Sequence, residues 1–353
     1  MPRVRGDISL PGDKSISHRA ALFAALSANH VKIENYSLGA DNMATLKCLM
    51  KLGVPVKMRG TTVDITGVNR YFSPKDPTNV RLYAGNSGTT MRLLTGILAG
   101  QRLYCMIGGD KSLNKRPMRR IAKPLAEMNA DVTMTNAFTA PIHINPAQLK
   151  AIDYTLPVAS AQVKSCILLA GLFADGETTV TEQIQTRNHT ELMLNLRTDN
   201  NRITSSIKSP IEINDMLIPG DISSAAFLLV LTLLSKNSKL TIRSVSINPT
   251  RTGILTVFDQ MGVEYDIENE HESNREPFAD ITIFGRQKTK GFHLSGDIIP
   301  NVIDEIPILA ALAALSEGES LFENIEELRF KESDRIDAIQ QNLKELGVKS
   351  EST

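Results

Sequence analysis

The chain has 353 residues, of which 42% are hydrophobic and 22% charged, the profile of a globular protein with about two domains. Lys and Arg together number 39, as do Asp and Glu, and this zero net charge argues against bulk attraction to nucleic acid or membranes. The three cysteines are widely spaced in apolar runs, which favours reduced thiols over a disulfide framework. No apolar run approaches the roughly 20 residues of a membrane span, and no signal peptide precedes the first predicted strand. We therefore expect a cytoplasmic protein.

The first predicted segment, residues 12–36, consists of a turn, an apolar helix over 20–26 and a strand. Its helix start carries Lys14, Ser15 and Arg19. These residue types suit a phosphate, because lysine supplies a point charge, arginine a fork of donors and serine a neutral donor. The spacing is not that of a Walker A loop. The alternative is a capped helix start with solvated charges.

The second segment, residues 85–107, repeats this plan with a helix predicted over 91–99. Its turn is Gly-Asn-Ser-Gly-Thr-Thr, followed by Met91 and Arg92. Glycines at both ends of the first four residues let a ligand approach the backbone, and the hydroxyls and Arg92 add donors.

A strongly basic loop, residues 109–120, follows this strand and contains five basic residues and one acidic residue. We expect Pro117 at the first position of the next helix, a position that proline favours. Lys115 and Arg116 would then lie at a helix N-terminus, where a positive charge opposes the helix dipole. This placement predicts a bound anion, and the alternative is a solvated basic loop.

The third segment, residues 160–182, begins with Ser160, Ala161 and Gln162 and continues as a helix predicted over 163–173. Arg187 and His189 follow its strand as further donors. The six histidines show no metal-ligand spacing and the chain has no C-x-x-C motif, so a metal is not predicted. We expect His189 to act as a structural hydrogen-bonding residue.

The fourth and fifth segments, residues 220–245 and 304–325, complete the series with helices predicted over 225–234 and 307–315. Asp304 opens the fifth segment, and Glu332 lies just before the next amphipathic helix. Two carboxylates near basic groups can serve as general acid and base. The alternative for Glu332 and for Asp334 is capping of that helix.

Each of the five segments is followed by a second, more amphipathic helix, which we predict over residues 41–52, 117–128, 190–196, 252–261 and 333–346. Several of these helices end in a Gly-Val step, and glycine there suits a helix C-cap. The sequence therefore predicts a repeated unit of helix–strand–helix–strand–strand, and each unit is about 60–80 residues long. The alternative is that such segments occur in any α/β protein. Several helix N-termini converging on one cleft would bind a multiply charged anion.

Taken in order, eight motifs closely resemble the EPSP synthase family, within the enolpyruvyl transferases. They are PGDKSISHRA, GNSGTTMRLL, GDKSLNKRPM, SAQVKSCILLAGL, TRNHTELML, PGDISSAAF, DEIPILAALAAL and RFKESDRI. They cover nearly the whole chain, and their order makes the resemblance specific although each motif alone is weak.

The resemblance implies an α/β (α+β) fold of two domains built from βαβαββ units, of the inside-out α/β barrel type, with five of six units visible. One domain would comprise residues 1–10 and 222–353, the other residues 11–221, with hinge crossings near 10–14 and 219–224. Domain closure around both ligands would exclude water. The helix–strand repeat found in the sequence agrees with this plan.

The resemblance also implies a 3-phosphoshikimate 1-carboxyvinyltransferase of the shikimate pathway, which makes chorismate and the aromatic amino acids. Such an enzyme transfers the enolpyruvyl group of phosphoenolpyruvate to the 5-hydroxyl of shikimate 3-phosphate by addition–elimination, without a cofactor. A monomer is expected, with no nucleic acid or membrane as partner. Gly88 implies sensitivity to glyphosate, because a side chain there would narrow the phosphoenolpyruvate site.

Site residues follow from the matched motifs. The implied catalytic residues are Lys14, Asp304 and Glu332. Implied contacts with shikimate 3-phosphate are Lys14, Ser15, Arg19, Ser160, Ala161, Gln162, Arg187, Asp304 and Lys331. Implied contacts with phosphoenolpyruvate are Lys14, Asn86, Gly88, Thr89, Arg116, Gln162, Glu332 and Arg335.

Two departures from the family pattern stand out. The pattern continues beyond the 331–335 motif into a sixth unit, whereas this sequence ends at Thr353, so the C-terminal end is expected to be missing. The third unit is also short, because residues 196–198 lack the usual Gly-Val strand between helix and hairpin, as if residues were dropped. The rival function is a truncated, non-catalytic anion-binding fragment of this fold. The related UDP-N-acetylglucosamine enolpyruvyl transferase would need an N-terminal Lys-Asn motif and a loop cysteine near Arg116, and neither is present.

Overall fold

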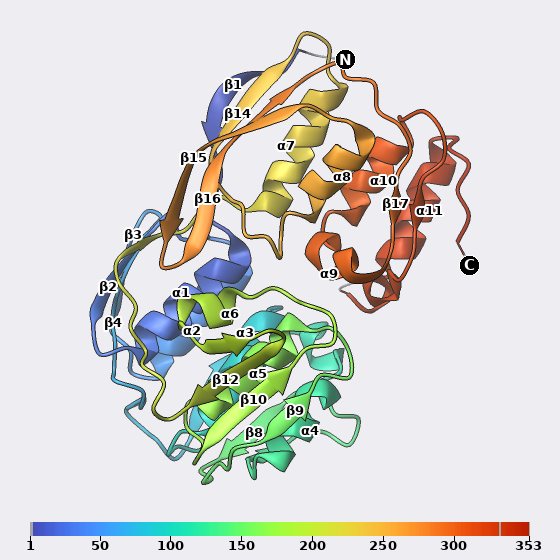
Figure 1. Ribbon diagram of the computed structural model, residues 1–353. Helices are drawn as coiled ribbons and strands as arrows, with labels where there is room; N and C mark the ends of the chain where they lie inside the picture. The colour runs from blue at the N-terminus through green and yellow to red at the C-terminus, as the bar shows by residue number, and fades with distance from the viewer. Residues whose placement is uncertain (1–2, 332, 353) are drawn as a thin grey trace. The chain divides into compact units, whose positions relative to one another are not determined.

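A computed structural model describes residues 3–331 and 333–352 (Figure 1). The chain divides into two compact units. Unit 1 comprises Met1–Leu10, Pro219–Glu272 and Pro277–Thr353, and unit 2 comprises Pro11–Ile218 and Ser273–Glu276. The chain thus passes from unit 1 to unit 2 after Leu10 and returns after Ile218, and the short segment Ser273–Glu276 belongs to unit 2 again.

Unit 2 contains three four-stranded sheets with their helices. The first repeat consists of α1 (Lys14–Leu26), β2 (His30–Glu34), α2 (Ala40–Lys51), β3 (Val56–Arg59), β4 (Thr62–Thr66) and the distant β13 (Met216–Leu217). The second consists of β5 (Val80–Tyr83), α3 (Gly88–Ala99), β6 (Cys105–Gly108), η1 (Leu113–Lys115), α4 (Arg119–Glu127), β7 (Asp131–Thr133) and β8 (Ile142–Asn145). The third consists of β9 (Asp153–Thr155), α5 (Ala161–Gly171), β10 (Glu177–Thr181), α6 (His189–Met193), β11 (Arg197–Asp199) and β12 (Arg202–Ser206).

Unit 1 contains the fourth repeat and the described part of the fifth. The fourth consists of β1 (Arg5–Ser9), α7 (Ile222–Leu234), β14 (Lys239–Ser246), α8 (Gly253–Met261), β15 (Tyr265–Ser273) and β16 (Glu276–Phe284). The fifth consists of β17 (His293–Leu294), η2 (Gly296–Ile298), α9 (Ile299–Val302), α10 (Ile306–Ala313), β18 (Leu321–Phe322), η3 (Glu326–Phe330) and α11 (Arg335–Glu345).

One strand order recurs in all four four-stranded sheets. Each sheet has a parallel pair, such as β5–β6, followed by an antiparallel hairpin, such as β8–β7. The fifth repeat has only the parallel pair β17–β18 among the described residues. The predicted α/β fold of repeated βαβαββ units is therefore confirmed. The sheets are open, and no closed barrel forms within residues 3–331 and 333–352.

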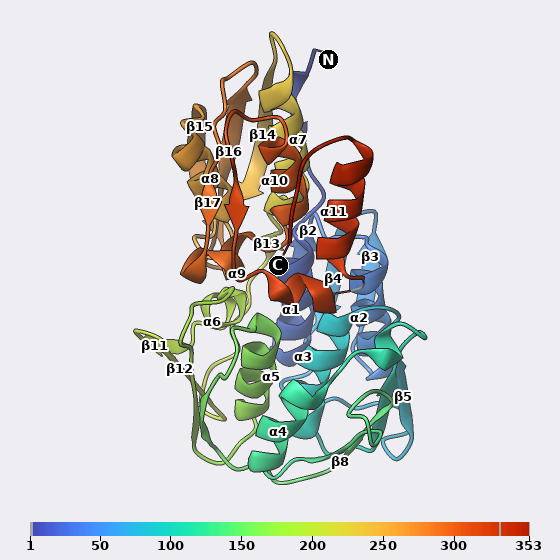
Figure 2. The ribbon, with the colours of Figure 1, turned by 90° about the vertical axis from the view of Figure 1, so that its right-hand side faces the viewer.

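Apolar helices form the core of unit 2, as Figure 2 shows for the adjacent α3 and α5. Every residue of α1 from Ile16 to Leu26 is buried. Helices α3 and α5 approach so closely that a Cβ added at Gly96 would lie 2.3 Å from the carbonyl oxygen of Cys166. Buried apolar residues of α7, α8 and α10 form a separate core in unit 1. In unit 2 the first helices α1, α3 and α5 are thus almost wholly buried, as their apolar sequences predict. In unit 1 the prediction holds only in part, because α7 exposes Phe227 and Leu231.

The third repeat is not missing its strand, so that expectation was wrong. Strand β11 begins at Arg197, four positions after α6 ends at Met193, and pairs with β12. What is short is helix α6, with five residues. At the end of α8, by contrast, Gly262 adopts φ +74° as the C-cap, which confirms the predicted role of glycine there. None of the helices described in residues 3–331 and 333–352 has both the length and the apolar character needed to cross a membrane.

Candidate active site

The phosphate-type motif of the first repeat lies within the first turns of α1. Asp13 caps the helix, because its carboxylate accepts a hydrogen bond from the Ile16 backbone N–H at 2.8 Å. The Lys14 side chain is half exposed, and its ammonium group lies 2.5 Å from the Asp41 carboxylate. A Cβ added at Gly12 would lie 2.0 Å from the Asn35 carbonyl oxygen, so only glycine fits at this turn. The charged end of Lys14 thus stays accessible at a fixed helix start.

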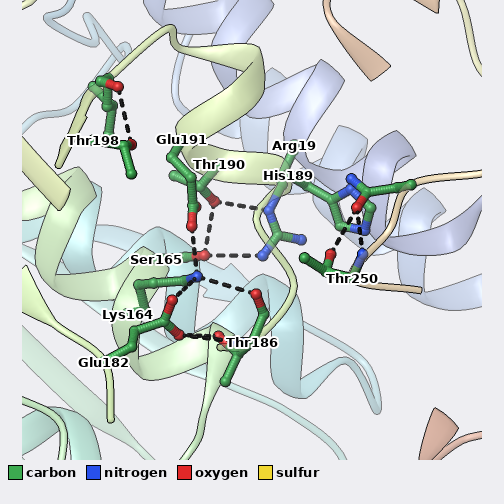
Figure 3. A network of polar contacts seen from close by, with 12 residues as sticks. Arg19, Lys164, Ser165, Glu182, Thr186, His189, Thr190, Glu191, Thr198 and Thr250 are labelled. Atoms are coloured by element: carbon green, nitrogen blue, oxygen red, sulfur yellow. Dashed lines mark hydrogen bonds and ion pairs between the residues drawn. The ribbon is translucent and has the colours of Figure 1, made fainter. Parts of the chain in front are cut away.

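Arg19 points into unit 2 from the same helix (Figure 3). Its guanidinium donates to the hydroxyls of Thr190 at 2.8 Å and Ser165 at 2.9 Å, and to the carbonyl of Ser15 at 3.1 Å. Burial lowers the pKa of Arg19 to about 10, and the Glu191 carboxylate opposes this shift. Arg19 therefore remains a buried cation that joins α1 to α5 and α6.

A second group of side chains surrounds the N-terminus of α3. The Gln162 side chain bridges two of them, because its carbonyl oxygen accepts from Arg92 at 2.5 Å and its amide donates to the Thr89 hydroxyl at 2.9 Å. Asn86 accepts from Arg116 and donates to the Asp110 carboxylate at 2.6 Å. Four of the residues predicted to contact one anion, Asn86, Thr89, Arg116 and Gln162, thus lie at this helix start together with Arg92.

Gly88 lies between two of these guanidinium groups. A Cβ added at Gly88 would lie 2.8 Å from Nη1 of Arg92 and 3.5 Å from Nη1 of Arg116. Hydrogen bonds from the Leu113 backbone and the Asn86 side chain lower the pKa of the nearby Asp110 carboxyl. Two guanidinium groups therefore lie beside a residue that has no side chain. Such a site suits a small anion, because arginine binds anions through charged hydrogen bonds.

The basic loop does not have the predicted helix start. Helix α4 begins at Arg119 after the N-cap Met118, so Pro117 precedes the helix instead of taking its first position. Arg116 ends the short helix η1 in an extended conformation. The physical reason is that Asp110 and Asn114 bind backbone groups of the loop and fold residues 109–115 into their own turn. Arg116 thereby turns toward Asn86 and not toward the helix axis.

The third repeat brings Arg187 to the start of α1. Ser160 caps α5 by accepting from the Val163 backbone N–H at 3.5 Å, and Ala161 begins the helix. Nη1 of Arg187 lies 3.5 Å from the Ser15 hydroxyl, although the two residues are 172 positions apart. His189 is buried, and its Nδ1 lies 2.8 Å from a carboxylate oxygen of Glu276, a contact suited to the structural role expected of it.

Unit 1 carries the predicted acidic residues. Asp304 lies 3.4 Å from Nη1 of Arg335 and 3.9 Å from the ammonium group of Lys331. Glu332 lies outside the described residues. Asp334 caps α11 by accepting from the Asp337 backbone N–H at 3.0 Å, which is the capping role weighed for it.

A buried arginine that sequence reasoning missed stabilises the helix starts next to Asp304. Arg251 is 2% exposed, and its guanidinium donates to the Ser223 hydroxyl at 2.6 Å. It also lies 3.6 Å from Asp221, the N-cap of α7, and 3.8 Å from Glu305, the N-cap of α10. No local signal marks Arg251, because its partners lie in other segments of the chain.

Lys164, Glu182 and Glu191 were also not assigned a substrate contact from the sequence. Lys164 lies inside a matched motif, two positions after the predicted site residue Gln162, and that position is the signal that would have found it. Within the described residues, no group of three or more His, Cys, Asp or Glu side chains is placed to hold a metal ion.

Comparison with known proteins identifies the family of this chain. A sequence model of the family described as EPSP synthase (3-phosphoshikimate 1-carboxyvinyltransferase) matches residues 1–353. The 3-phosphoshikimate 1-carboxyvinyltransferase of Thermoanaerobacter sp. (strain X514) is 42% identical over 351 residues, which are 98% of this chain and 82% of that protein. The protein of the same name from Bacillus subtilis (strain 168) is 43% identical over 357 residues, with 99% and 82% covered.

Solved structures give the same result. EPSP synthase from Acinetobacter baumannii superposes with a TM-score of 0.87 at 42% identity, covering 97% of this chain and 78% of that one. The enolpyruvyl transferase NikO from Streptomyces tendae, with a TM-score of 0.69 and 14% identity, shows a shared fold alone. The match along all 353 residues favours the enzyme over the non-catalytic fragment considered from the sequence. The chain therefore belongs to the EPSP synthase family, the 3-phosphoshikimate 1-carboxyvinyltransferases of the shikimate pathway.

Proposed function

We propose that this chain joins the enolpyruvyl group of phosphoenolpyruvate to the 5-hydroxyl of shikimate 3-phosphate. The hydroxyl oxygen adds to C2 of phosphoenolpyruvate while the methylene carbon C3 gains a proton, which gives a tetrahedral adduct. The C2–O bond to phosphate then breaks and the new methyl group loses a proton. The products are 5-enolpyruvylshikimate 3-phosphate and inorganic phosphate.

The observation that carries this proposal is the clustering of donors at two helix starts of unit 2. Asn86 and Arg116 lie beside Gly88 at the start of α3, where we place phosphoenolpyruvate together with Lys14, Thr89 and Gln162. Charged donors held in place by protein contacts stabilise the charge that develops as phosphate leaves.

Shikimate 3-phosphate is assigned to the start of α1 and its surroundings. The proximity of Arg187 to the Ser15 hydroxyl supports this assignment, because together they offer charged and neutral donors to one phosphate. Ser160, Ala161 and Gln162 at the start of α5 would contact the shikimate ring. Arg19, being buried, would act mainly by fixing this helix start.

The proton transfers are assigned to the carboxylates of the fifth repeat. Asp304 would take the proton of the 5-hydroxyl, since it lies beside the cations Lys331 and Arg335, which would also contact the substrates. Glu332 would protonate the methylene carbon. Its role rests on the matched motif alone.

We further propose that the protein is a cytoplasmic monomer, with hinges near residues 10–14 and 219–224. The chain crossings after Leu10 and after Ile218 support these hinge positions. Analytical ultracentrifugation would give the mass of a single chain, and cell fractionation would recover the protein in the cytoplasmic fraction. A dimer mass or recovery with membranes would contradict this assignment.

Phosphate release tests the proposed reaction directly. Release should require both substrates and should not occur with either one alone. Lys14→Met and Asp304→Asn should each lower kcat/KM by about 100-fold or more, because each removes a charged group that acts in the transition state. Lys57→Met, at an exposed lysine of β3, is the matched control and should behave as wild type. Absence of release from the wild-type chain would overturn the proposal.

A further inference from the structure

A buried ionic group contacts Thr186, the residue before the proposed phosphate ligand Arg187 (Figure 3). The Lys164 ammonium group is 0% exposed and contacts the carboxylates of Glu182 at 2.8 Å and Glu191 at 2.5 Å, which are 4% and 6% exposed. Removing three ions from water carries a large desolvation cost, so such a group is a poor source of stability compared with apolar packing. What it does supply is a fixed geometry.

The group fixes the segment that leads to Arg187. Lys164 belongs to α5, whereas Glu182 follows β10 and Glu191 belongs to α6. The other carboxylate oxygen of Glu182 accepts from both the backbone N–H, at 3.1 Å, and the hydroxyl of Thr186. Lys164 also lies 3.4 Å from the Thr186 carbonyl oxygen. Both the backbone N–H and the backbone carbonyl of Thr186 are therefore held by hydrogen bonds. Arg187 is the next residue in the chain.

A second layer of contacts runs beside the ionic one. Ser165 and Thr190, the neighbours of Lys164 and Glu191, are hydrogen-bonded to each other at 2.7 Å, and both accept from Arg19. The ionic layer and this hydroxyl layer thus join α5 to α6 at adjacent positions, as Figure 3 shows. A displacement of α6 relative to α5 would disturb both layers together.

We propose that Lys164 is a positioning residue for shikimate 3-phosphate. Through Glu182 and Glu191 it sets the position of Arg187 and, through α6, that of Arg19. Lys164 is too deeply buried to touch the substrate itself. This inference rests on the proposed role of Arg187 as a phosphate ligand.

The test compares three variants by steady-state kinetics with each substrate varied in turn. Lys164→Gln should raise the KM for shikimate 3-phosphate about tenfold or more, because a small misplacement of a binding group weakens binding strongly. The KM for phosphoenolpyruvate should change less than twofold, since two of its proposed ligands, Asn86 and Arg116, are held at the start of α3 by their contacts with each other and with Asp110. Thr186→Val keeps the buried ions and the side-chain volume, and should raise the same KM about threefold. Lys123→Gln, at an exposed lysine of α4, is the control.

Hydrogen exchange of the segment 183–188 provides the second measurement. Lys164→Gln should exchange faster there than wild type, while the exchange of β5–β6 stays unchanged. Equal increases in both KM values, or an unchanged KM for shikimate 3-phosphate in Lys164→Gln and Thr186→Val, would overturn the inference. If Lys164→Gln does not fold, Thr186→Val decides alone.

Arg187→Gln separates this inference from the function on which it rests. A raised KM for shikimate 3-phosphate in Arg187→Gln, with normal values in the Lys164 and Thr186 variants, would reject only the positioning role. A normal KM in Arg187→Gln would reject Arg187 as a ligand and the positioning inference with it.

Discussion

At the scale of single residues, the proposed phosphoenolpyruvate site depends on the absence of one side chain. Gly88 is the first residue of α3 and Ser87 caps the helix, so a larger residue would still be compatible with the helix start. The constraint comes from Arg92, whose Nη1 would lie 2.8 Å from a Cβ at position 88. Because Gln162 holds that guanidinium, relief of the clash would break a hydrogen bond within the site.

We therefore predict that Gly88→Ala weakens binding at this site without unfolding the protein. The KM for phosphoenolpyruvate should rise about three- to tenfold, equivalent to about 1 kcal/mol, because the added methyl group displaces Arg92. Glyphosate should inhibit the wild type, and its inhibitory concentration should rise further than this KM. Inhibition curves at fixed phosphoenolpyruvate measure both effects. Gly6→Ala, where a Cβ meets nothing within 4 Å, is the control. Unchanged inhibition in Gly88→Ala would contradict the proposed site.

At the scale of elements, a chain of buried polar groups joins the first three helices of unit 2. Nδ1 of His18 on α1 lies 2.7 Å from the Thr45 hydroxyl on α2, which lies 2.7 Å from the Thr90 hydroxyl on α3. Thr90 in turn donates to Ser87, the α3 cap, at 2.8 Å. Burial, followed by the charges of Lys14 and Arg19, lowers the pKa of His18 from 6.5 to about 3. The imidazole is therefore neutral at physiological pH.

This neutral histidine predicts a loss of stability in mild acid. The unfolded chain binds a proton at His18 below pH 6.5 and the folded chain does not until about pH 3, so its contribution is present above pH 6.5 and is lost as pH falls. The slope should approach about 1.4 kcal/mol per pH unit. Urea unfolding at pH 5, 6 and 7 should show a smaller loss for His18→Asn than for wild type. His143→Asn, at an exposed histidine of β8, should retain the wild-type slope. An equal slope in His18→Asn would contradict this account.

At the scale of the whole molecule, the chain carries two separate large cores. Buried apolar residues from Ile16 to Ile218 form one cluster, and those from Ile222 to Leu312 form another. Unit 1 is discontinuous in sequence, because β1 pairs with β14 across more than 200 residues. Since a domain with its own core can unfold as a unit, the two halves need not lose structure together.

We predict two unfolding transitions in urea. Hydrogen exchange followed by mass spectrometry separates them by peptide, which matters because the chain has no Trp to report on either core. Shikimate 3-phosphate at 100 times its Kd should stabilise the peptides of unit 2 by about 2.7 kcal/mol, since most of its proposed ligands lie there, and those of unit 1 by less. Coincident exchange of all peptides at every urea concentration would show a single cooperative unit instead.

The sequence by itself determined the repeat, the buried first helices of unit 2 and the helix starts that carry the proposed ligands. These features depend on local properties, namely apolar periodicity, capping residues and glycine turns, and they lie within a few residues of one another. The motif at 85–92, for example, already contains the cap Ser87 and the open position Gly88.

Only the tertiary structure decided which polar side chains meet. Lys164 reaches carboxylates 18 and 27 positions away, and Arg19 reaches Thr190 across 171 positions. Two sheets also take an edge strand from a distant part of the chain. Strand β1 pairs with β14, and β13 pairs with β2. The loop of Pro117 folded differently from its helix-start signal because side chains of the loop bind its own backbone. Such contacts depend on how distant segments pack in three dimensions, so they cannot be predicted from the local sequence.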